Sequence, residues 1–556
     1  MDNQRLFIWA SLALVLWLNY TTWQNDYAPP PPAPSTTAAN PAAPTDQSAE
    51  TLPSLPRDSG SATAPSLPNT APSTDAVEAA STIRVFTDVL ELHISTRGGE
   101  LQQADLLKYP KVKGEPESVR LLNTDNLFVA RSGLRVAGET NEPTHLAQFA
   151  AAATEYRLQP GQEKLEVPLT WTAGGVTVTK IYTFEPGSYR IGLRYDVDNQ
   201  SPKDWKAASY VQIVRHYEHL ERSYFNVETY SYRGPVIFDG KGARKLDVED
   251  SDDRHFRAAI TGGWLAAIQH HFVTAAVPPV DVTYDYELNV DPKNNYTLSY
   301  RGPLVPVASG ARHTFSELLF VGPKLQDQLA VTGPRLELVA DYGMLTIISK
   351  PLFWLLSRVY DFIGNWGLAI IIVTFLIKLV FYKLTAASGR SMAKMRNLAP
   401  RIKAIQERYK DDREQLGRQM MEIYKREKIN PLAGCLPILI QIPVFLAFYW
   451  VLLESVEMRQ APFFLWITDL SARDPYFILP VIMGAAMFIQ FKLQPMPTTD
   501  PMQAKIFAFM PVIMAGTMVM FPSGLVLYWL TNTVLSIAQQ WRINKLVAAE
   551  SKKAAS

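Results

Sequence analysis

A single lysine, Lys378, interrupts the apolar run at 368–381, in which the only other polar residue is Thr374. A charge inside a membrane helix costs about 2.5 to 3.5 kcal/mol on insertion scales, so this lysine must reach the surface, pair, or face water. It could snorkel to the basic end of the helix at Lys383, or it could face a water-filled polar cavity. Thr374 lies one turn earlier on the same face, which favours the cavity.

Other residue types exclude several kinds of chemistry. Cys435 is the only cysteine, so no internal disulfide can form, and thiolate zinc and iron–sulfur sites are excluded. All eight histidines lie between His93 and His313, and no carboxylate pair or third ligand accompanies them at a recognisable spacing. Phosphate-binding loops and the HExxH and GxSxG motifs are missing from the sequence. We therefore expect no metal, no cofactor and no enzymatic activity.

Four more apolar runs follow Lys378, at 431–453, 476–491, 506–521 and 525–537. Each is near or below the length that spans a bilayer. They carry polar residues, namely Gln441, Gln490, Thr531, Asn532, Thr533 and Ser536, and Gln539 and Gln540 follow shortly after the last run. Such residues often serve packing between membrane helices. Together with Lys378 they predict a wet interior.

The N-terminal part of the chain predicts a membrane anchor followed by a tether. Residues 1–27 contain one arginine, Arg5, before a mostly apolar stretch, and no small-residue cleavage motif follows it. We therefore expect an uncleaved anchor helix with a cytoplasmic N-terminus. Residues 28–80 are rich in Pro, Ala, Ser and Thr and hold no aromatic residue, which predicts a disordered linker.

Period-two patterning in 81–335 predicts a large antiparallel β-sandwich. The clearest hairpin joins 176–184 to 189–197 through a Glu-Pro-Gly-Ser turn. Further strands are expected at 83–94, 264–277, 296–300 and 313–321. The pairs His216 with His219 and His270 with His271 are interpreted as solvated or core residues rather than ligands.

Helical periodicity returns at 336–365, where it predicts an amphipathic helix on the membrane surface or, alternatively, a last helix packed on the sandwich. A membrane helix is expected at 366–383. Residues 384–430 predict a basic helical hairpin, because 383–428 hold thirteen Lys and Arg against six Asp and Glu, a net charge of +7. Its candidate docking residues are Arg396, Arg401, Lys403, Arg408 and Lys410.

Charge asymmetry predicts the topology. The basic hairpin belongs in the cytoplasm, and the acidic loop at 454–474 belongs outside. Four further membrane helices at 431–545 and a cytoplasmic tail at 546–556 complete six spans. Both termini are then cytoplasmic, and residues 28–365 are periplasmic.

Long motifs in the C-terminal half resemble those of one family, the YidC membrane protein insertases. They are NPLAGCLPILIQIP at 430–443, RQAPFFLW at 459–466, TDPMQ at 499–503 and FPSGLVLY at 521–528. The similarity is strong over 340–545, and the anchor, linker and β-domain follow the layout of Gram-negative members. The family's β-domain resembles the supersandwich of mutarotase-like proteins, which implies no sugar chemistry.

The resemblance implies a bacterial inner-membrane insertase and chaperone, working alone or with the Sec translocon. Its five-helix core encloses a hydrophilic groove open to cytoplasm and lipid. Lys378 occupies the position of the groove's basic residue, where most members carry arginine, and Trp529 stands where Gram-negative relatives often have tyrosine. The expected groove residues are Lys378, Thr374, Gln441, Tyr528, Trp529 and Asn532. Expected partners are nascent membrane proteins, the Sec translocon, the lipid bilayer, and the ribosome or signal recognition particle receptor at the hairpin.

Two rival functions remain. A secondary transporter would use Lys378 as a substrate or ion site, but it predicts internal repeats and helices broken at mid-membrane, which the sequence does not indicate. A membrane-tethered periplasmic enzyme would need a carboxylate and histidine pair in the β-domain.

Overall fold

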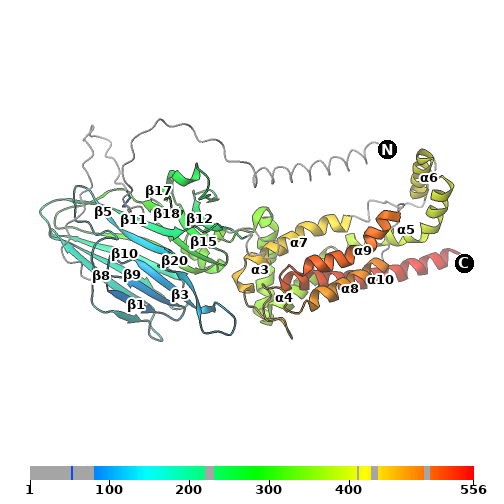
Figure 1. Ribbon diagram of the computed structural model, residues 1–556, viewed down its shortest axis with the longest axis horizontal. Helices are drawn as coiled ribbons and strands as arrows, with labels where there is room; N and C mark the ends of the chain where they lie inside the picture. Colours follow the sequence, from blue (N-terminus) through cyan, green and yellow to red (C-terminus); the bar gives the residue numbers. More distant parts are fainter. Residues whose placement is uncertain are drawn as a thin grey trace. The chain divides into compact units, whose positions relative to one another are not determined.

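A computed structural model of the chain describes residues 52–53, 81–219, 231–409, 412–426, 436–493 and 501–555 (Figure 1). Within these residues, strands occupy the chain from Thr82 to Pro323, and α-helices follow from Gln326 to Ala555. The predicted anchor at 1–27 lies outside the described residues, as does the predicted linker at 28–80 except for residues 52–53. The predictions for these two segments therefore stay predictions.

The described strands form two sheets, one of 11 strands and one of 9. In spatial order the first sheet contains β14 (Arg257–Thr261), β17 (Thr283–Val290), β18 (Asn295–Arg301), β11 (Trp205–His216), β5 (Val129–Val136), β3 (Leu101–Pro110), β2 (Leu90–Ser95), β1 (Thr82–Phe86) and β7 (Glu155–Arg157), with β19 (Val305–Val307) on β11 and β4 (Ser118–Leu122) on β3. The second contains β13 (Ala243–Lys245), β12 (Arg233–Phe238), β15 (Trp264–Gln269), β16 (Phe272–Val277), β20 (Arg312–Pro323), β10 (Arg190–Asn199), β9 (Val176–Phe184), β8 (Leu165–Ala173) and β6 (Ala150–Ala151). The predicted β-sandwich is confirmed, and β1 with β7 forms a parallel pair that the sequence did not indicate.

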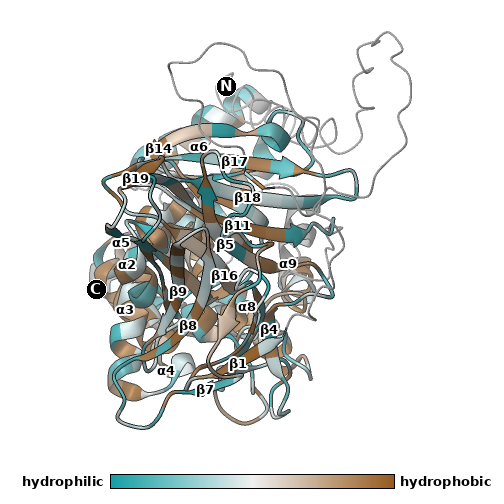
Figure 2. Cartoon of the chain, turned by 90° about the vertical axis from the view of Figure 1, so that its left-hand side faces the viewer, coloured by the Kyte–Doolittle hydropathy of each residue, from teal (hydrophilic) through white to brown (hydrophobic). Residues whose placement is uncertain are grey.

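The predicted hairpin is formed by β9 and β10, which pair antiparallel from Ile191 opposite Phe184 onward. Alternate residues of β10 point into the core, and Ile191, Leu193, Tyr195 and Val197 are each at most 1% exposed. In Figure 2, brown and teal segments alternate along the strands in the same way. A side-chain period of two with one buried face therefore decides this register.

Two segments predicted as single strands are hairpins instead. The segment 83–94 turns at Thr87, whose Oγ1 accepts a hydrogen bond from Leu90 N at 2.9 Å, and so forms β1 and β2. The segment 264–277 turns at His270 and His271, between β15 and β16. His270 adopts the left-handed conformation with φ 43°. No Gly, Pro or Asn occurs at this second turn, so the local sequence did not predict it.

The described helices are α2 (Gln326–Thr332), α3 (Thr346–Ile363), α4 (Trp366–Val380), α5 (Tyr382–Arg408), α6 (Arg413–Arg426), α7 (Leu436–Glu454), α8 (Ile478–Leu493), α9 (Pro501–Met518) and α10 (Ser523–Ala555). One apolar cluster joins α3, α4, α7, α8 and α10, with Leu356, Ile370, Val451, Met483 and Val526 at its centre. The amphipathic α3 therefore packs on α4 and α7, while its Ile347 and Phe362 are 87% and 91% exposed.

Within the described residues, no single helix is both long and apolar enough to cross a membrane by itself. The pair Trp366–Val380 and Tyr382–Met395 meets the criteria together, with a bend of 70° between its members. Shorter apolar helices are Gln441–Glu454, Ile478–Leu493 and Phe509–Met518. The predicted count of six spans accordingly stays a prediction.

A fully buried lysine links the two sheets inside the sandwich. Lys180 Nζ of β9 donates hydrogen bonds to the carbonyl oxygens of Gly98, Gly99 and Ser132, at 2.8, 3.0 and 3.2 Å. Gly99 has φ +61°, and a Cβ on it would lie 3.0 Å from Lys180 Cδ. Burial lowers the pKa of Lys180 to about 7, although the charges of Glu100 and Glu317 oppose the shift.

This pKa predicts how stability depends on pH. The ordinary value is 10.5 and the folded value about 7, so the unfolded chain binds more protons between them and stability rises with pH in that window. The destabilising effect of Lys180 is fully present below pH 7. We expect the free energy of unfolding of the β-sandwich to gain up to about 1.4 kcal/mol per pH unit from this group. Denaturant unfolding of the full chain at pH 7 and 9 measures it.

Lys180→Met should lose this pH dependence, because the titrating group is gone. The matched control is Lys206→Met, which removes an exposed lysine of β11 and should keep the wild-type dependence. An equal slope in wild type and Lys180→Met would contradict the assignment.

Candidate functional site

The helix that carries Lys378 is positioned by a cap at its start. Asn365 Oδ1 accepts a hydrogen bond from Leu368 N at 3.0 Å, which satisfies one of the free N–H groups at the start of α4. Thr374 is 2% exposed, and its hydroxyl donates to Ile370 O within the same helix at 2.6 Å. Its polar group is therefore already satisfied by the backbone, one turn before Lys378.

Lys378 Nζ donates a hydrogen bond to Ser536 Oγ of α10 at 2.7 Å. Ser536 in turn donates to Asn532 O at 2.7 Å. Among the described residues no carboxylate forms an ion pair with this half-buried lysine. Its ammonium group lies against a neighbouring helix rather than extending toward Lys383, a geometry that favours the polar cavity over snorkelling.

Two cavities adjoin Lys378, and together they collect all six predicted groove residues. The larger has a volume of about 300 Å³ and the smaller about 40 Å³. Lys378, Gln441 and Asn532 line both of them. Thr374 and Tyr528 line the smaller one and Trp529 the larger. Residues from α4, α7 and α10, far apart in sequence, thus line one site in which polar and apolar side chains are mixed.

Aromatic side chains form one side of this site. Trp529 meets Phe445 edge to face, with ring centroids 4.7 Å apart. Tyr528 stacks on Phe448 at 4.4 Å and is only 3% exposed. Such contacts hold α10 against α7 and leave apolar surface beside the polar groups.

The sequence did not indicate the contribution of α5. Thr385, Ser388 and Met392 line the larger cavity, although they follow Tyr382 in the stretch assigned to the hairpin. Gln539 Nε2 donates to Thr385 Oγ1 at 2.8 Å, which joins α10 to α5. The sequence feature that could have indicated this contribution is the presence of two small polar residues, Thr385 and Ser388, shortly after the apolar run ends before Tyr382.

The predicted docking residues lie on or beside α5. Arg401 and Arg408 are exposed there. Arg396 and Lys403 also belong to α5, but their side chains are outside the described part, and Lys410 lies outside the described residues. The apolar faces of α5 and α6 meet in a cluster of Met395, Leu398, Ile402 and Ile423. The two predicted hairpin helices therefore pack together.

Comparisons with known proteins cover both halves of the chain. The family described as 60Kd inner membrane protein matches residues 358–551, and the YidC periplasmic domain family matches residues 82–355. The protein named membrane protein insertase YidC from Nitrosococcus oceani is 44% identical over 556 residues, covering 99% of this chain and 100% of the relative. The chain belongs to the YidC family of membrane protein insertases. A second relative of that name, from Alkalilimnicola ehrlichii, is 45% identical over 560 residues, covering 100% of this chain and 98% of the relative.

A solved structure titled as an active YidC insertase with its first transmembrane domain resolved is also similar. It is 19% identical and covers 83% of this chain and 92% of its own, with a TM-score of 0.38. Membership of the YidC family confirms the predicted resemblance and the predicted fold class of a large periplasmic β-domain with a helical C-terminal region, while the number of spans stays a prediction. It also establishes a bacterial inner-membrane protein with a periplasmic domain.

Hydration of the cavity can be tested with a cysteine-free variant, Cys435→Ser. In that background, Asn532→Cys should react several times faster with a hydrophilic maleimide than Val526→Cys in membrane vesicles. Asn532 lines both cavities, whereas Val526 on the same helix is 0% exposed. Thiol modification requires access to water. Equal labelling rates at the two positions would show that the cavity is dry.

Proposed function

We propose that this protein inserts membrane proteins and assists their folding, and that its cavity at Lys378 receives the polar segment of the incoming chain. Support comes from a cavity of about 300 Å³ set among apolar helices and lined by polar side chains of α5, α7 and α10. Its relatives are named insertases, and neither a transporter nor an enzyme name occurs among the curated relatives above. Insertion is not an enzymatic conversion, and it needs no cofactor.

In this proposal, insertion is accelerated because the cavity lowers the energy barrier for moving a polar segment across the bilayer. A polar segment that crosses a bilayer loses its hydration, and a water-filled cavity within the membrane removes part of that cost. Burial of the incoming apolar helix in lipid then supplies the driving force. In this scheme the protein lowers a kinetic barrier and supplies no energy.

Lys378 attracts acidic segments in this proposal. Its ammonium is held by one hydroxyl, Ser536, and by no carboxylate among the described residues, so its charge is available to a ligand in the cavity. A lysine acts as a point charge rather than as the bidentate fork of arginine, so it should attract carboxylates without fixing their orientation. Phe445 and Trp529 would then contact the apolar part of the substrate.

The proposed topology has six spans, counting the anchor at 1–27. Both termini and the hairpin at 384–430 lie in the cytoplasm, and residues 28–365 lie in the periplasm. The net charge of +7 over 383–428 supports this orientation. The exposed apolar residues of α3, Ile347 and Phe362, would lie in the membrane surface.

The hairpin of α5 and α6 is the proposed docking element for a ribosome or the signal recognition particle receptor. Its apolar residues pack against each other, which leaves Arg401 and Arg408 on the exposed side. Ribosomal RNA is anionic, so a basic helical surface suits it. The Sec translocon and the surrounding lipid are further proposed partners.

Substitution of Lys378 tests the electrostatic role. Lys378→Arg should retain activity because the charge remains, whereas Lys378→Ala should lower insertion of a substrate with an acidic translocated tail by about tenfold, or ~1.4 kcal/mol in barrier. Lys378→Glu should lower it further through repulsion. A matched substrate with a neutral tail should be affected less. Insertion yields of both substrates into vesicles give the answer.

The matched control is Lys383→Ala, which removes an exposed charge of the same sign that lines neither cavity. It should leave both yields near wild type. Equal loss for acidic and neutral substrates in Lys378→Ala would refute a role for the charge.

Charge reversal on α5 tests the docking role. The double variant Arg401→Glu and Arg408→Glu should weaken binding of ribosome–nascent-chain complexes and reduce the slope of log K against log salt by about 2. Binding of the detergent-purified protein at several salt concentrations measures both effects.

Arg358→Glu serves as control, because it reverses an exposed charge on α3, on the proposed opposite side of the membrane. Unchanged ribosome binding by the double variant would rule out docking through these two residues.

A further inference from the structure

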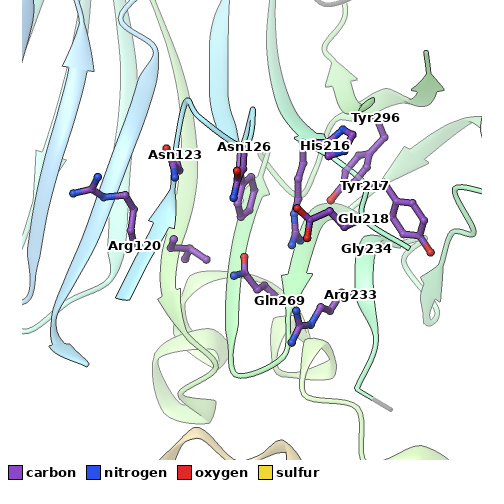
Figure 3. A pocket seen from close by; sticks show the side chains of 13 residues that line it. Arg120, Asn123, Asn126, His216, Tyr217, Glu218, Arg233, Gly234, Gln269 and Tyr296 are labelled. Atoms are coloured by element: carbon purple, nitrogen blue, oxygen red, sulfur yellow. The ribbon is translucent and has the colours of Figure 1, made fainter. Parts of the chain in front are cut away.

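A second cavity lies in the β-sandwich, where ends of strands from both sheets meet. It has a volume of about 120 Å³. One side comes from the first sheet, with Arg215 at the end of β11 and Tyr296 at the start of β18. The other comes from the second sheet, with Arg233 at the start of β12 and Gln269 at the end of β15. Figure 3 shows Tyr296, Arg233 and Gln269 around one space, with Asn123 and Asn126 on a third side.

We propose that this cavity binds a small hydroxylated carboxylate, held by its carboxylate at Arg215 and by its hydroxyl groups at Tyr296 and the neighbouring amides. The site is independent of the insertion role proposed for the cavity at Lys378.

Arg215 supplies the charge for the carboxylate. Its Nη1 donates to Ile268 O of the second sheet at 3.0 Å, and its guanidinium lies 4.7 Å from the centre of the Phe128 ring. These contacts fix the side chain but leave its charge without a carboxylate partner among the described residues. A planar guanidinium held in this way is suited to bind a carboxylate through two hydrogen bonds.

Three other charged residues line the cavity, namely Arg120, Arg233 and Glu218. Arg120 already forms two hydrogen bonds to Asp105, at 2.8 and 3.0 Å, so its charge is compensated. Arg233 adds a second guanidinium to the lining, and Glu218 adds one carboxylate. Arg215 therefore supplies the positive charge for an anion, while Glu218 can accept a hydrogen bond from a ligand hydroxyl.

The buried hydroxyl of Tyr296 is a second observation that favours a ligand in this cavity. Its side chain is 0% exposed, and its hydroxyl lies near Arg215 but makes no hydrogen bond of normal geometry within the protein. A buried hydroxyl without a partner costs free energy, and a ligand oxygen in the cavity would satisfy it. Burial raises the pKa of Tyr296, so the hydroxyl keeps its proton and can donate.

Cavity size and the amide side chains define the rest of the ligand. A cavity of about 120 Å³ is comparable to one that holds a benzene ring, so it suits roughly six to ten non-hydrogen atoms. Asn123, Asn126 and Gln269 each offer a donor and an acceptor, which match hydroxyl groups better than apolar carbon. An extended peptide is too large for this space.

Three related compounds test the proposal on the purified full chain: erythronate, erythritol and butyrate. Erythronate carries hydroxyls and a carboxylate, erythritol only hydroxyls, and butyrate only a carboxylate. Equilibrium dialysis should show saturable binding of erythronate in the millimolar range or tighter, and binding of the other two at least about tenfold weaker. Equal binding of erythronate and erythritol, or no saturable binding of erythronate below about 10 mM, would overturn the proposal.

Two variants locate the site. Arg215→Gln should weaken erythronate binding by about tenfold, and Tyr296→Phe by about threefold. Tyr296→Phe should change the melting temperature little, because the lost hydroxyl makes no hydrogen bond of normal geometry within the protein. The control Arg312→Gln removes an exposed arginine paired with Asp198 and should bind erythronate like wild type. If Tyr296→Phe binds as wild type does, or if Arg312→Gln weakens binding equally, the assignment of this cavity is wrong.

Discussion

The need to solvate a positive charge inside an apolar helix dominates the helical part of this protein. Lys378 has no carboxylate partner among the described residues, and its ammonium group instead meets Ser536 and the space beside it. Such a charge is tolerated in a membrane only where polar groups or water surround it. Polar residues of α5, α7 and α10 line the cavity at this point and surround the charge, and this is the cavity proposed to receive the polar segment of an incoming chain.

Lys180 in the β-sandwich and Lys378 in the helical part differ in how many hydrogen-bond partners the protein gives them. In the β-sandwich, Lys180 donates to three carbonyl oxygens and is enclosed by both sheets, so its hydrogen bonds are made within the fold although its buried charge lowers stability. Lys378 makes one hydrogen bond to a side chain and lines two cavities, so most of its hydrogen-bonding capacity is left for other groups. A fully satisfied charge is structural, whereas a partly satisfied charge beside a cavity can act on a ligand.

Local patterns in the sequence predicted much of this architecture. The alternation in 176–197 predicted β9 and β10 with the correct face buried, because a side-chain period of two leaves one choice once the apolar residues are known. The segments 83–94 and 264–277 were wrongly predicted as single strands, because turns at Thr87 and His270 carry weak local signals. Pairing between distant strands, such as the parallel pair of β1 and β7, has no local signature at all.

For the cavity at Lys378, the sequence by itself determined which residue types were anomalous: a lysine in an apolar helix and amides in the apolar runs after it. Family motifs then indicated which of them share a groove. Only the tertiary structure decided that Lys378 meets Ser536 and that Thr385 of α5 lines the same space. The same holds in the sandwich, where Arg215 and Gln269 meet across two sheets. Periodicity reports which face of one element is buried, whereas contacts between elements depend on how their surfaces pack.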